Sequence, residues 1–373
     1  MGLNTAALPD FPWDSLAPLR ARAEAHPDGI VDLSVGTPVD PTPDVVQERL
    51  RAASNWAGYP TTHGTAQVRE AIAGWFAQRR GVPDVDPRAV LPTVGSKELV
   101  ALLPSLMGLG PGDTVVFPSA AYPTYDVGAV LAGARARAAD AVAEWADDPT
   151  VRLVWVNSPS NPTGAVAGVD ELREVVQAAR RLGAVVASDE CYAELAWEEP
   201  WVSQGVPSIL DPRVSEGDHT GLLAVYSLSK QSNLAGYRAA FVAGCPTVVS
   251  RLVEARKHMG LIVPGPVQDA MVAALTDPSH VVAQREVYGK RRAVLASALR
   301  AAGWRIDHSQ AVLYLWSTRN EDCGESLGWL AERGILAAPG AFYGAAGGRH
   351  VRIALTATDE RIASAAHRLA KSQ

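Results

Sequence analysis

Short apolar runs alternate with longer helical patterns between residues 64 and 245. Most of these runs are nearly continuous in valine, leucine and alanine, as expected for strands that are buried on both faces. The predicted strands are residues 89–94, 114–118, 152–156, 184–188, 222–226 and 239–243. Helical patterns occupy residues 65–80, 98–107 and 169–182. The alternation predicts an α/β layer with a mostly parallel central sheet.

The C-terminal part of the chain has a different pattern. A long helical segment at 279–301 precedes short strand patterns at 304–306, 313–316 and 350–355, and a last helix begins at Asp359. This order predicts a smaller α+β unit, with about the first forty residues packed on it. We therefore expect a large domain at residues 41–270 and a discontinuous small domain at residues 1–40 and 271–373.

Composition narrows the class of protein. The chain has 373 residues, 47% hydrophobic and 20% charged, and a formal net charge of −6. No dense Lys/Arg cluster could follow a phosphate backbone, so we expect no nucleic-acid partner. The three cysteines are far apart and predict neither disulfides nor a metal site. No membrane-length apolar run and no secretion signal is present, which favours a cytoplasmic enzyme.

Polar segments follow four of the predicted strands. They are Gly95-Ser96-Lys97, residues 157–164, Asp189 and residues 227–230. Ligands of parallel sheets bind beyond the carboxyl ends of the strands. These four segments therefore predict a single ligand site at this edge of the sheet.

The fourth segment contains the run Tyr226-Ser227-Leu228-Ser229-Lys230, and Arg238 follows eight residues after the lysine. A lysine amine can form an imine with a cofactor aldehyde and so become the centre of carbon–nitrogen chemistry. Read alone, the run is equally typical of a loop lysine in water. The spacing of serine, lysine and arginine is that found around the Schiff-base lysine of pyridoxal-phosphate enzymes.

Taken together, the segments resemble the fold-type I pyridoxal-phosphate aminotransferases of class I/II. The resemblance runs from Gly36 to Arg352. It implies pyridoxal 5′-phosphate as the cofactor, amino acids and keto acids as substrates, and ping-pong transfer of an amino group. It also implies a homodimer in which Tyr59 reaches the cofactor phosphate of the other subunit.

The resemblance assigns the cofactor phosphate to two segments. The turn Gly95-Ser96-Lys97 would form one half of a phosphate cup, since backbone N–H groups at a helix N-terminus suit an anion. Ser227 and Arg238 would form the other half, with a hydroxyl and a guanidinium fork.

The resemblance also implies which residues hold the cofactor ring. Tyr122 would stack on it, and Asn161 and Tyr192 would hydrogen-bond its phenolic oxygen. Asp189 would keep the pyridine nitrogen protonated, which makes the ring an electron sink. Lys230 would hold the cofactor and act as the general base. Read alone, Tyr122 is typical of a turn and Asp189 of a capping aspartate; their combination with Lys230 favours the site.

Substrate binding is assigned to Gly36, Asn161 and Arg352. Gly36 would bring a backbone amide to the substrate carboxylate, because a residue without Cβ allows so close an approach. Arg352 would clamp the α-carboxylate bidentately. The competing interpretation of Arg352 is a charge on an alternating strand, with Val351 and Ile353 buried and Arg352 facing outward, towards solvent or a cleft.

Further runs resemble the actinobacterial N-succinyldiaminopimelate aminotransferases of lysine and peptidoglycan-precursor biosynthesis. They are residues 9–14, 26–31, 210–213, 217–220, 329–335 and 356–361. This resemblance implies amino transfer between glutamate and N-succinyl-2-amino-6-oxopimelate. Because this substrate has two more carboxylates at its far end, we hypothesise that Lys97, Lys257 or His258 contacts one of them.

Three alternatives share the same motifs. The chain could be an aminotransferase for aspartate, alanine or aromatic acids, or a β-lyase of the same fold. It could also be a non-catalytic pyridoxal-phosphate sensor domain. The lack of an attached helix-turn-helix or basic arm, and the presence of Lys230, Asp189 and Arg352 together, argue against the sensor.

Overall fold

The computed structural model describes residue 8 and residues 12–370. Of the sequence motifs, part of the run at 9–14 lies outside the described residues. No helix in the described ranges is both long enough and apolar enough to cross a membrane.

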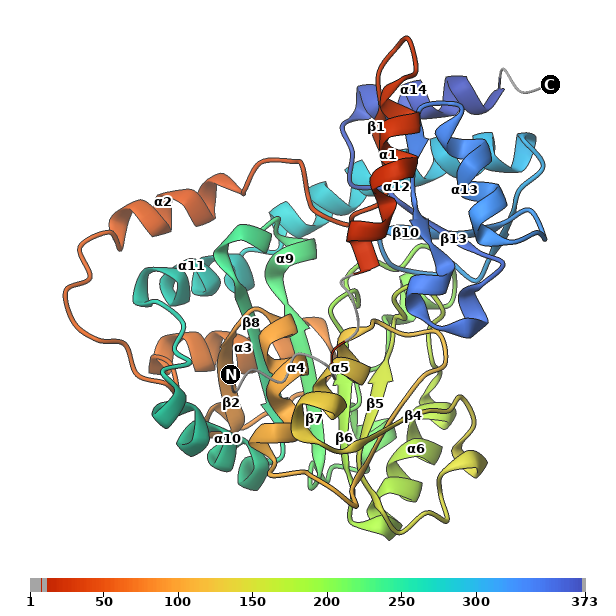
Figure 1. Cartoon of the computed structure of the whole chain (residues 1–373). Coiled ribbons are helices and arrows are strands. Elements are labelled where there is room, and N and C mark those ends of the chain that lie inside the picture. Colours follow the sequence, from red (N-terminus) through yellow and green to blue (C-terminus); the bar gives the residue numbers. More distant parts are fainter. Residues whose placement is uncertain (1–7, 9–11, 371–373) are drawn as a thin grey trace, which may run out of the picture.

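A seven-stranded sheet forms the centre of the larger part of the molecule (Figure 1). The strand order is β2-β8-β7-β6-β5-β3-β4, and β8 alone runs antiparallel to both of its neighbours. The mostly parallel sheet predicted from the alternating pattern is thereby confirmed. Its strands are β2 (Val90–Val94), β3 (Thr114–Phe117), β4 (Arg135–Ala138), β5 (Val151–Asn157), β6 (Val185–Asp189), β7 (Leu222–Ser227) and β8 (Ala239–Gly244).

The sheet is buried on both faces. Successive residues of one strand enter different apolar clusters: Leu153 of β5 belongs to one and Val154 to the other. Since side chains alternate across a strand, each cluster marks one face of the sheet. Helices α4 (Ser96–Leu106), α5 (Thr124–Ala132) and α10 (Pro246–Met259) cover the Leu153 face. Helices α3 (Ala66–Arg79), α6 (Val169–Leu182) and α11 (Gly265–Thr276) cover the Val154 face.

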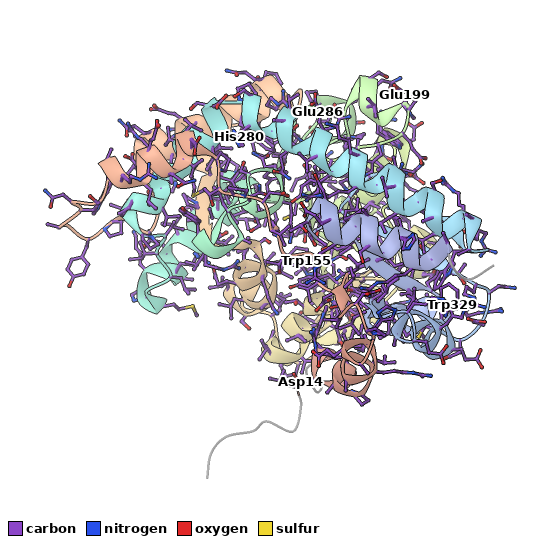
Figure 2. The ribbon with its side chains drawn as sticks, turned by 90° about the horizontal axis from the view of Figure 1, so that it is seen from above. Asp14, Trp155, Glu199, His280, Glu286 and Trp329 are labelled. Carbon is purple, nitrogen blue, oxygen red and sulfur yellow. The ribbon has the colours of Figure 1, made fainter. Side chains whose placement is uncertain are left out.

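A four-stranded sheet of order β12-β13-β10-β9 forms the centre of the smaller part. Its strands are β9 (Arg305–Asp307), β10 (Tyr314–Thr318), β12 (Ala338–Pro339) and β13 (Val351–Ala354). The helices of this part are α12 (Ser279–Ala301), α13 (Cys323–Ala331) and α14 (Asp359–Ala370). In Figure 2, His280 and Glu286 mark α12 along the outside, whereas Trp155 of β5 lies in the interior.

The beginning of the chain lies beside its end. Strand β1 (Val31–Asp32) pairs in parallel with β11 (Ile335–Leu336), and helix α1 (Ala17–Glu24) contacts α13 (Figure 1). This arrangement agrees with packing of the first forty residues on the C-terminal unit. The division of the chain at residues 41 and 271 stays a prediction.

The remaining helices are short or peripheral. Helix α2 (Asp44–Ala52) packs on α11, and α9 (Leu228–Gln231) carries the lysine of the sequence motif. Helices α7 (Trp201–Gln204) and α8 (Pro212–Ser215) are single turns between β6 and β7.

Strand β4 was not predicted from the sequence. Its residues are Arg-Ala-Arg-Ala, without the continuous apolar run of a central strand. It lies at the edge of the sheet and pairs only with β3, so polar side chains are tolerated there.

Candidate active site

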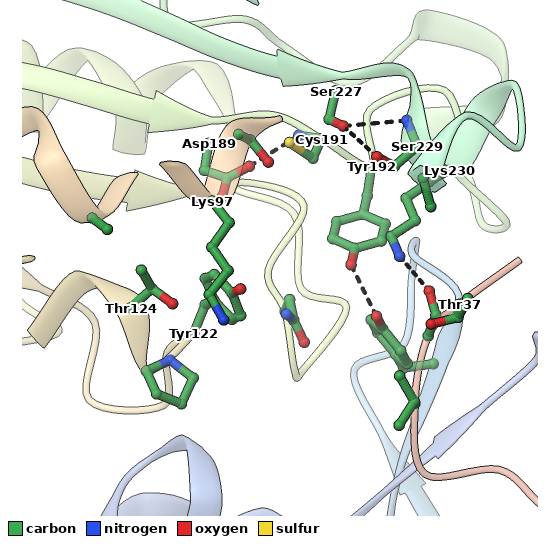
Figure 3. A pocket seen from close by; sticks show the side chains of 18 of the residues that line it. Thr37, Lys97, Tyr122, Thr124, Asp189, Cys191, Tyr192, Ser227, Ser229 and Lys230 are labelled. Carbon is green, nitrogen blue, oxygen red and sulfur yellow. Dashed lines mark hydrogen bonds between the residues drawn. The ribbon is translucent and has the colours of Figure 1, made fainter. Parts of the chain in front are cut away.

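A pocket of about 710 Å³ opens at the carboxyl ends of the central strands. Figure 3 shows part of its lining, with Asp189 and Lys230 approaching the space from different elements. Eleven of the thirteen residues proposed from the sequence line it, so the structure brings the separate motifs together. They are Gly36, Ser96, Lys97, Tyr122, Asn161, Asp189, Tyr192, Ser227, Lys230, Arg238 and Arg352.

Lys230 enters the pocket from helix α9, directly after β7. The Ser227 hydroxyl caps this short helix by accepting a hydrogen bond from the backbone N–H of Ser229, at 3.2 Å. Capping fixes the direction in which the helix leaves the strand. The Lys230 ammonium then donates to the carbonyl oxygen of Gly36 (Figure 3). The lysine thus spans from the central sheet to the segment that precedes α2.

Gly36 must be a glycine in this arrangement. A Cβ at this position would lie 2.0 Å from the hydroxyl oxygen of Tyr314. The backbone and the tyrosine could not both keep their places with any larger residue.

Gly95 and Arg238 form one compact unit beside the start of α4. The backbone N–H of Gly95 donates to the carbonyl oxygen of Arg238 at 2.8 Å. Gly95 has a φ of 76°, and a Cβ on it would lie 2.0 Å from Nη2 of Arg238. The guanidinium therefore lies against the turn that opens the helix. Together with the first N–H groups of α4 and the Ser227 hydroxyl, it suits a phosphate group.

Asp189 ends strand β6 at the base of the pocket. Its carboxylate accepts a hydrogen bond from the Tyr125 hydroxyl at 2.9 Å and another from the Cys191 backbone N–H at 3.2 Å. Burial raises the pKa of this carboxyl, and hydrogen bonds from the Cys191 thiol, the Cys191 backbone N–H and the Tyr125 hydroxyl act against the rise. A buried carboxylate with part of its lone pairs already used is suited to hold one protonated ring nitrogen.

Arg352 is buried, with 3% of its surface exposed, and its guanidinium lines the pocket. It donates to Oδ1 of Asn161 at 3.0 Å and to the carbonyl oxygen of Ser34 at 2.9 Å. Its guanidinium carbon lies 3.9 Å from the ring centroid of Tyr314 and 4.9 Å from that of Tyr343. The sequence left open whether Arg352 faces solvent or a cleft. In the structure it faces the cleft.

Tyr192 and Tyr314 form a hydrogen-bonded pair, with 3.0 Å between their hydroxyl oxygens. Burial raises the pKa of Tyr192. Burial acts in the same way on Tyr314, but the charges of Arg352 and Lys230 outweigh it and lower the pKa of this phenol. The Tyr314 hydroxyl of the pair is thus exposed to the charge of both cations, and either hydroxyl can donate in the bond.

Tyr122 lines the same pocket at the start of α5, with its ring edge-on to that of Tyr125 at 6.0 Å. Lys97, in the first turn of α4, also lines the pocket. Burial raises the pKa of Tyr122 and keeps its hydroxyl protonated. Both residues are labelled in Figure 3.

Three candidates lie elsewhere on the chain. Tyr59 has a relative exposure of 101% and borders a surface groove together with Trp56 and Lys257. Lys257 pairs with Glu254 at 2.7 Å, and His258 is exposed. Lys97, Lys257 and His258 were the candidates for contact with a distal carboxylate of the substrate. Of these three, only Lys97 lines the pocket within one chain.

Sequence reasoning missed Tyr125, Tyr314 and Cys191. Tyr125 lies in the run around Tyr122, and Tyr314 lies in the predicted strand at 313–316, but a tyrosine among apolar residues signals a core position. Cys191 was considered only as one of three distant cysteines, although it follows Asp189 by two residues and lines the pocket. The bonds of Tyr125 to Asp189 and of Tyr314 to Tyr192 join segments 64 and 122 residues apart, which no local pattern shows.

A lysine, a buried carboxylate, an anion cup and an arginine clamp in one pocket define an enzyme site for amine chemistry. Comparison with known proteins gives the family. The family model for class I and II aminotransferases matches residues 28–369, and the chain belongs to this family. Enzymes of the family depend on pyridoxal phosphate, and the cup at Gly95 and Arg238 and the carboxylate of Asp189 fit that group.

Two relatives are 57% identical to the chain. One is a probable aminotransferase of Mycobacterium tuberculosis, matched over 98% of this chain and 86% of the relative. The other is a 4-dedimethylamino-4-oxo-anhydrotetracycline transaminase of Streptomyces rimosus, matched over 97% of this chain and 99% of the relative. A solved structure described as a probable N-succinyldiaminopimelate aminotransferase from Thermus thermophilus superimposes with a TM-score of 0.86. It is 29% identical, and the match covers 97% of this chain and 100% of that one.

Proposed function

We propose that this aminotransferase exchanges an amino group between glutamate and N-succinyl-2-amino-6-oxopimelate. The observation that carries this proposal is the charge of the pocket lining. Its cations are Lys97, Lys230, Arg238 and Arg352. Arg238 suits the cofactor phosphate, Lys230 the imine and Arg352 the α-carboxylate, and Lys97 adds a fourth positive charge to the lining that suits an anionic far end of the substrate.

Each residue of the pocket has a distinct part in this proposal. Pyridoxal phosphate, when bound, supplies the aldehyde that carries the amino group and a ring that accepts electron density. Lys230 would act as the general base that removes the proton from the substrate α-carbon and would return this proton to the cofactor carbon. Asp189 would hold a proton at the ring nitrogen, and Tyr122 would lie against the ring.

The substrate is held at its α-carboxylate. Arg352 binds that carboxylate, and Asn161 keeps the guanidinium oriented by accepting one of its N–H groups. Because Nδ2 of Asn161 is not used in that bond, it can donate a hydrogen bond to the phenolic oxygen of the cofactor, as can the hydroxyl of Tyr192.

The Streptomyces relative supports a second candidate, a polycyclic ketone as amino acceptor. The pocket lining includes apolar residues that would suit such a substrate: Trp13, Val35, Ala101, Pro123 and Val127. A flat apolar acceptor would pack on these side chains and would not need Lys97.

The test is a set of half-reactions with the cofactor-loaded protein. Each reaction is monitored through the visible absorption band of the bound cofactor. N-Succinyl-LL-diaminopimelate and glutamate are expected to discharge the band quickly, and aspartate and alanine slowly. The opposite order would refute the substrate assignment and leave the aminotransferase chemistry in place. An assay of amino transfer to 4-dedimethylamino-4-oxo-anhydrotetracycline tests the second candidate.

Substitution of Lys97 tests the charge argument. Lys97→Ala is expected to raise the KM for the succinylated amine by about tenfold or more, the value of one charge-assisted hydrogen bond. Lys290→Ala, at an exposed lysine of α12 that lines neither the pocket nor the groove at Tyr59, is the matched control and should leave this KM unchanged. An unchanged KM in Lys97→Ala would contradict a contact with the distal carboxylates.

A further inference from the structure

Tyr314 lies at the meeting point of the two sheets of the molecule. It begins strand β10 of the four-stranded sheet and lines the pocket at the edge of the seven-stranded sheet. Only 3% of its surface is exposed. Its position is fixed from both sides: strand pairing with β13 holds its backbone, and pocket residues surround its ring.

The hydroxyl of Tyr314 contacts two parts of the reaction site. It lies 3.0 Å from the hydroxyl of Tyr192, a bond drawn as a dashed line from Tyr192 in Figure 3. It also lies against Gly36, where no Cβ could be placed. The carbonyl oxygen of Gly36 in turn accepts the hydrogen bond from Lys230.

The ring of Tyr314 contacts a third part, the carboxylate clamp. The guanidinium carbon of Arg352 lies 3.9 Å from the ring centroid, at the distance of a cation–π contact. The same guanidinium donates hydrogen bonds to Oδ1 of Asn161 and to the carbonyl oxygen of Ser34, and these two bonds fix its orientation. The ring therefore supports one face of the group that binds the substrate carboxylate.

We propose that Tyr314 is a positioning residue that connects the carboxylate clamp to Tyr192. Its ring supports the guanidinium of Arg352, and its hydroxyl orients the hydroxyl that Tyr192 presents to the cofactor. The proposal rests on the transamination chemistry given above and is independent of the identity of the substrate.

Charged and titratable groups surround Tyr314 from several elements. They are Arg352 from β13, Lys230 from α9, Tyr192 from the segment after β6, Tyr122 before α5, Tyr288 from α12 and Tyr343. Burial raises the pKa of Tyr314, and the charges of Arg352 and Lys230 outweigh that effect. The clamp arginine and the lysine therefore act on the same hydroxyl that contacts Tyr192.

The first test removes the hydroxyl and keeps the ring. In the cofactor-loaded protein, without substrate, the visible band is titrated with pH. Tyr314→Phe is expected to move the midpoint by about half a pH unit, in the same direction as Tyr192→Phe and by less. The double variant should move it no further than Tyr192→Phe alone.

Tyr343→Phe is the matched control for this titration. Tyr343 is a second buried tyrosine beside Arg352, and its hydroxyl has no hydrogen-bond partner among the described residues. Loss of that hydroxyl should leave the midpoint in place. An unchanged midpoint in Tyr314→Phe, or an equal shift in Tyr343→Phe, would overturn the proposed link to Tyr192.

The second test separates the ring from the hydroxyl. Succinate, an unreactive dicarboxylate, is titrated into the cofactor-loaded protein in a calorimeter. Tyr314→Phe should bind it with less than a twofold change in Kd, and Tyr314→Leu about tenfold more weakly, since the leucine removes the cation–π contact. Equal weakening in both variants would overturn the support of Arg352 by the ring. Neither test uses the succinylated substrate, so both outcomes are independent of the substrate assignment.

Discussion

Single residues decide how closely the charged groups of this site approach one another. At Gly36 the absence of a Cβ lets the backbone contact Tyr314, and at Gly95 it lets Arg238 lie against the turn that opens α4. The two glycines therefore fix the spacing between the lysine, the clamp and the cup. An alanine at either position would push a functional side chain away from its place.

At the residue scale, the role of Lys230 can be tested by its attachment to the cofactor. Lys230→Ala should lower the rate of α-proton exchange by about 10²–10⁴-fold, because the general base is lost. After borohydride reduction, the mass of the intact wild-type chain should increase by one cofactor, and the variant should not change. Lys97→Ala removes another pocket lysine and should keep the mass increase. Attachment lost in Lys97→Ala and kept in Lys230→Ala would reverse the assignment.

At the scale of elements, the four-stranded sheet is held by contacts between side chains of different strands. Asp307 of β9 pairs with Arg305 at 2.6 Å and with His350, just before β13, at 2.8 Å. The ring of His350 stacks on Trp316 of β10, with 4.8 Å between centroids. One carboxylate thus connects β9 to the strand that carries Arg352.

This network predicts a pH dependence of stability. The hydrogen bond from Arg305 lowers the pKa of Asp307 to about 2. A carboxyl whose pKa is lower in the folded protein stabilises it above the unfolded pKa of about 3.9, and this contribution is lost as the pH falls towards 2. Asp307→Asn should therefore lower the Tm by roughly 1–3 °C at pH 7, and the difference should disappear between about pH 4 and pH 2.

Asp86→Asn is the control for the thermal measurement. Asp86 binds Arg88 within one exposed turn and connects no strands, so its loss should change the Tm less. If the Tm of Asp307→Asn remained lower than that of the wild type below pH 2, the carboxylate charge would not be the cause of the difference.

At the scale of the whole molecule, the surface around Tyr59 raises the question of assembly. Tyr59 and Met259 are exposed large side chains, and Trp56 is exposed on 37% of its surface. Exposed aromatic and sulfur-containing side chains of this size favour contact with another protein surface. We propose that this surface meets a second copy of the chain, in which Tyr59 reaches the other subunit's pocket.

Mixing two inactive variants tests this assembly. Tyr59→Ala lacks the residue supplied to the other subunit, and Lys230→Ala lacks the lysine of its own pocket. Random exchange of subunits should restore about a quarter of the wild-type activity, because half of the dimers are mixed and each has one complete site. No recovery after exchange, verified by differently tagged subunits, would contradict a shared site. A fully active monomer at the assay concentration would do so as well.

The central layer could be predicted from the sequence because its strands are buried on both faces. Continuous apolar runs such as residues 222–226 contrast with amphipathic helical patterns such as Val169–Leu182, and the observed ends differ from the predicted ones by at most two residues. The elements without such a signal were missed. Strand β4 is polar and lies at an edge, and β1 and β11 have two residues each.

The sequence by itself determined the family, the cofactor and the residues that could meet at one edge of the sheet. It could do so because the chemistry requires particular residue types at particular spacings, as around Lys230 and Asp189. Only the tertiary structure decided which neighbours these residues have. Arg352 stacks on Tyr314 across two paired strands of the four-stranded sheet, and Tyr314 bonds to Tyr192, which lies 122 residues away in the chain. No local pattern can encode such contacts, because they arise only when distant strands pair and the two parts of the molecule pack together.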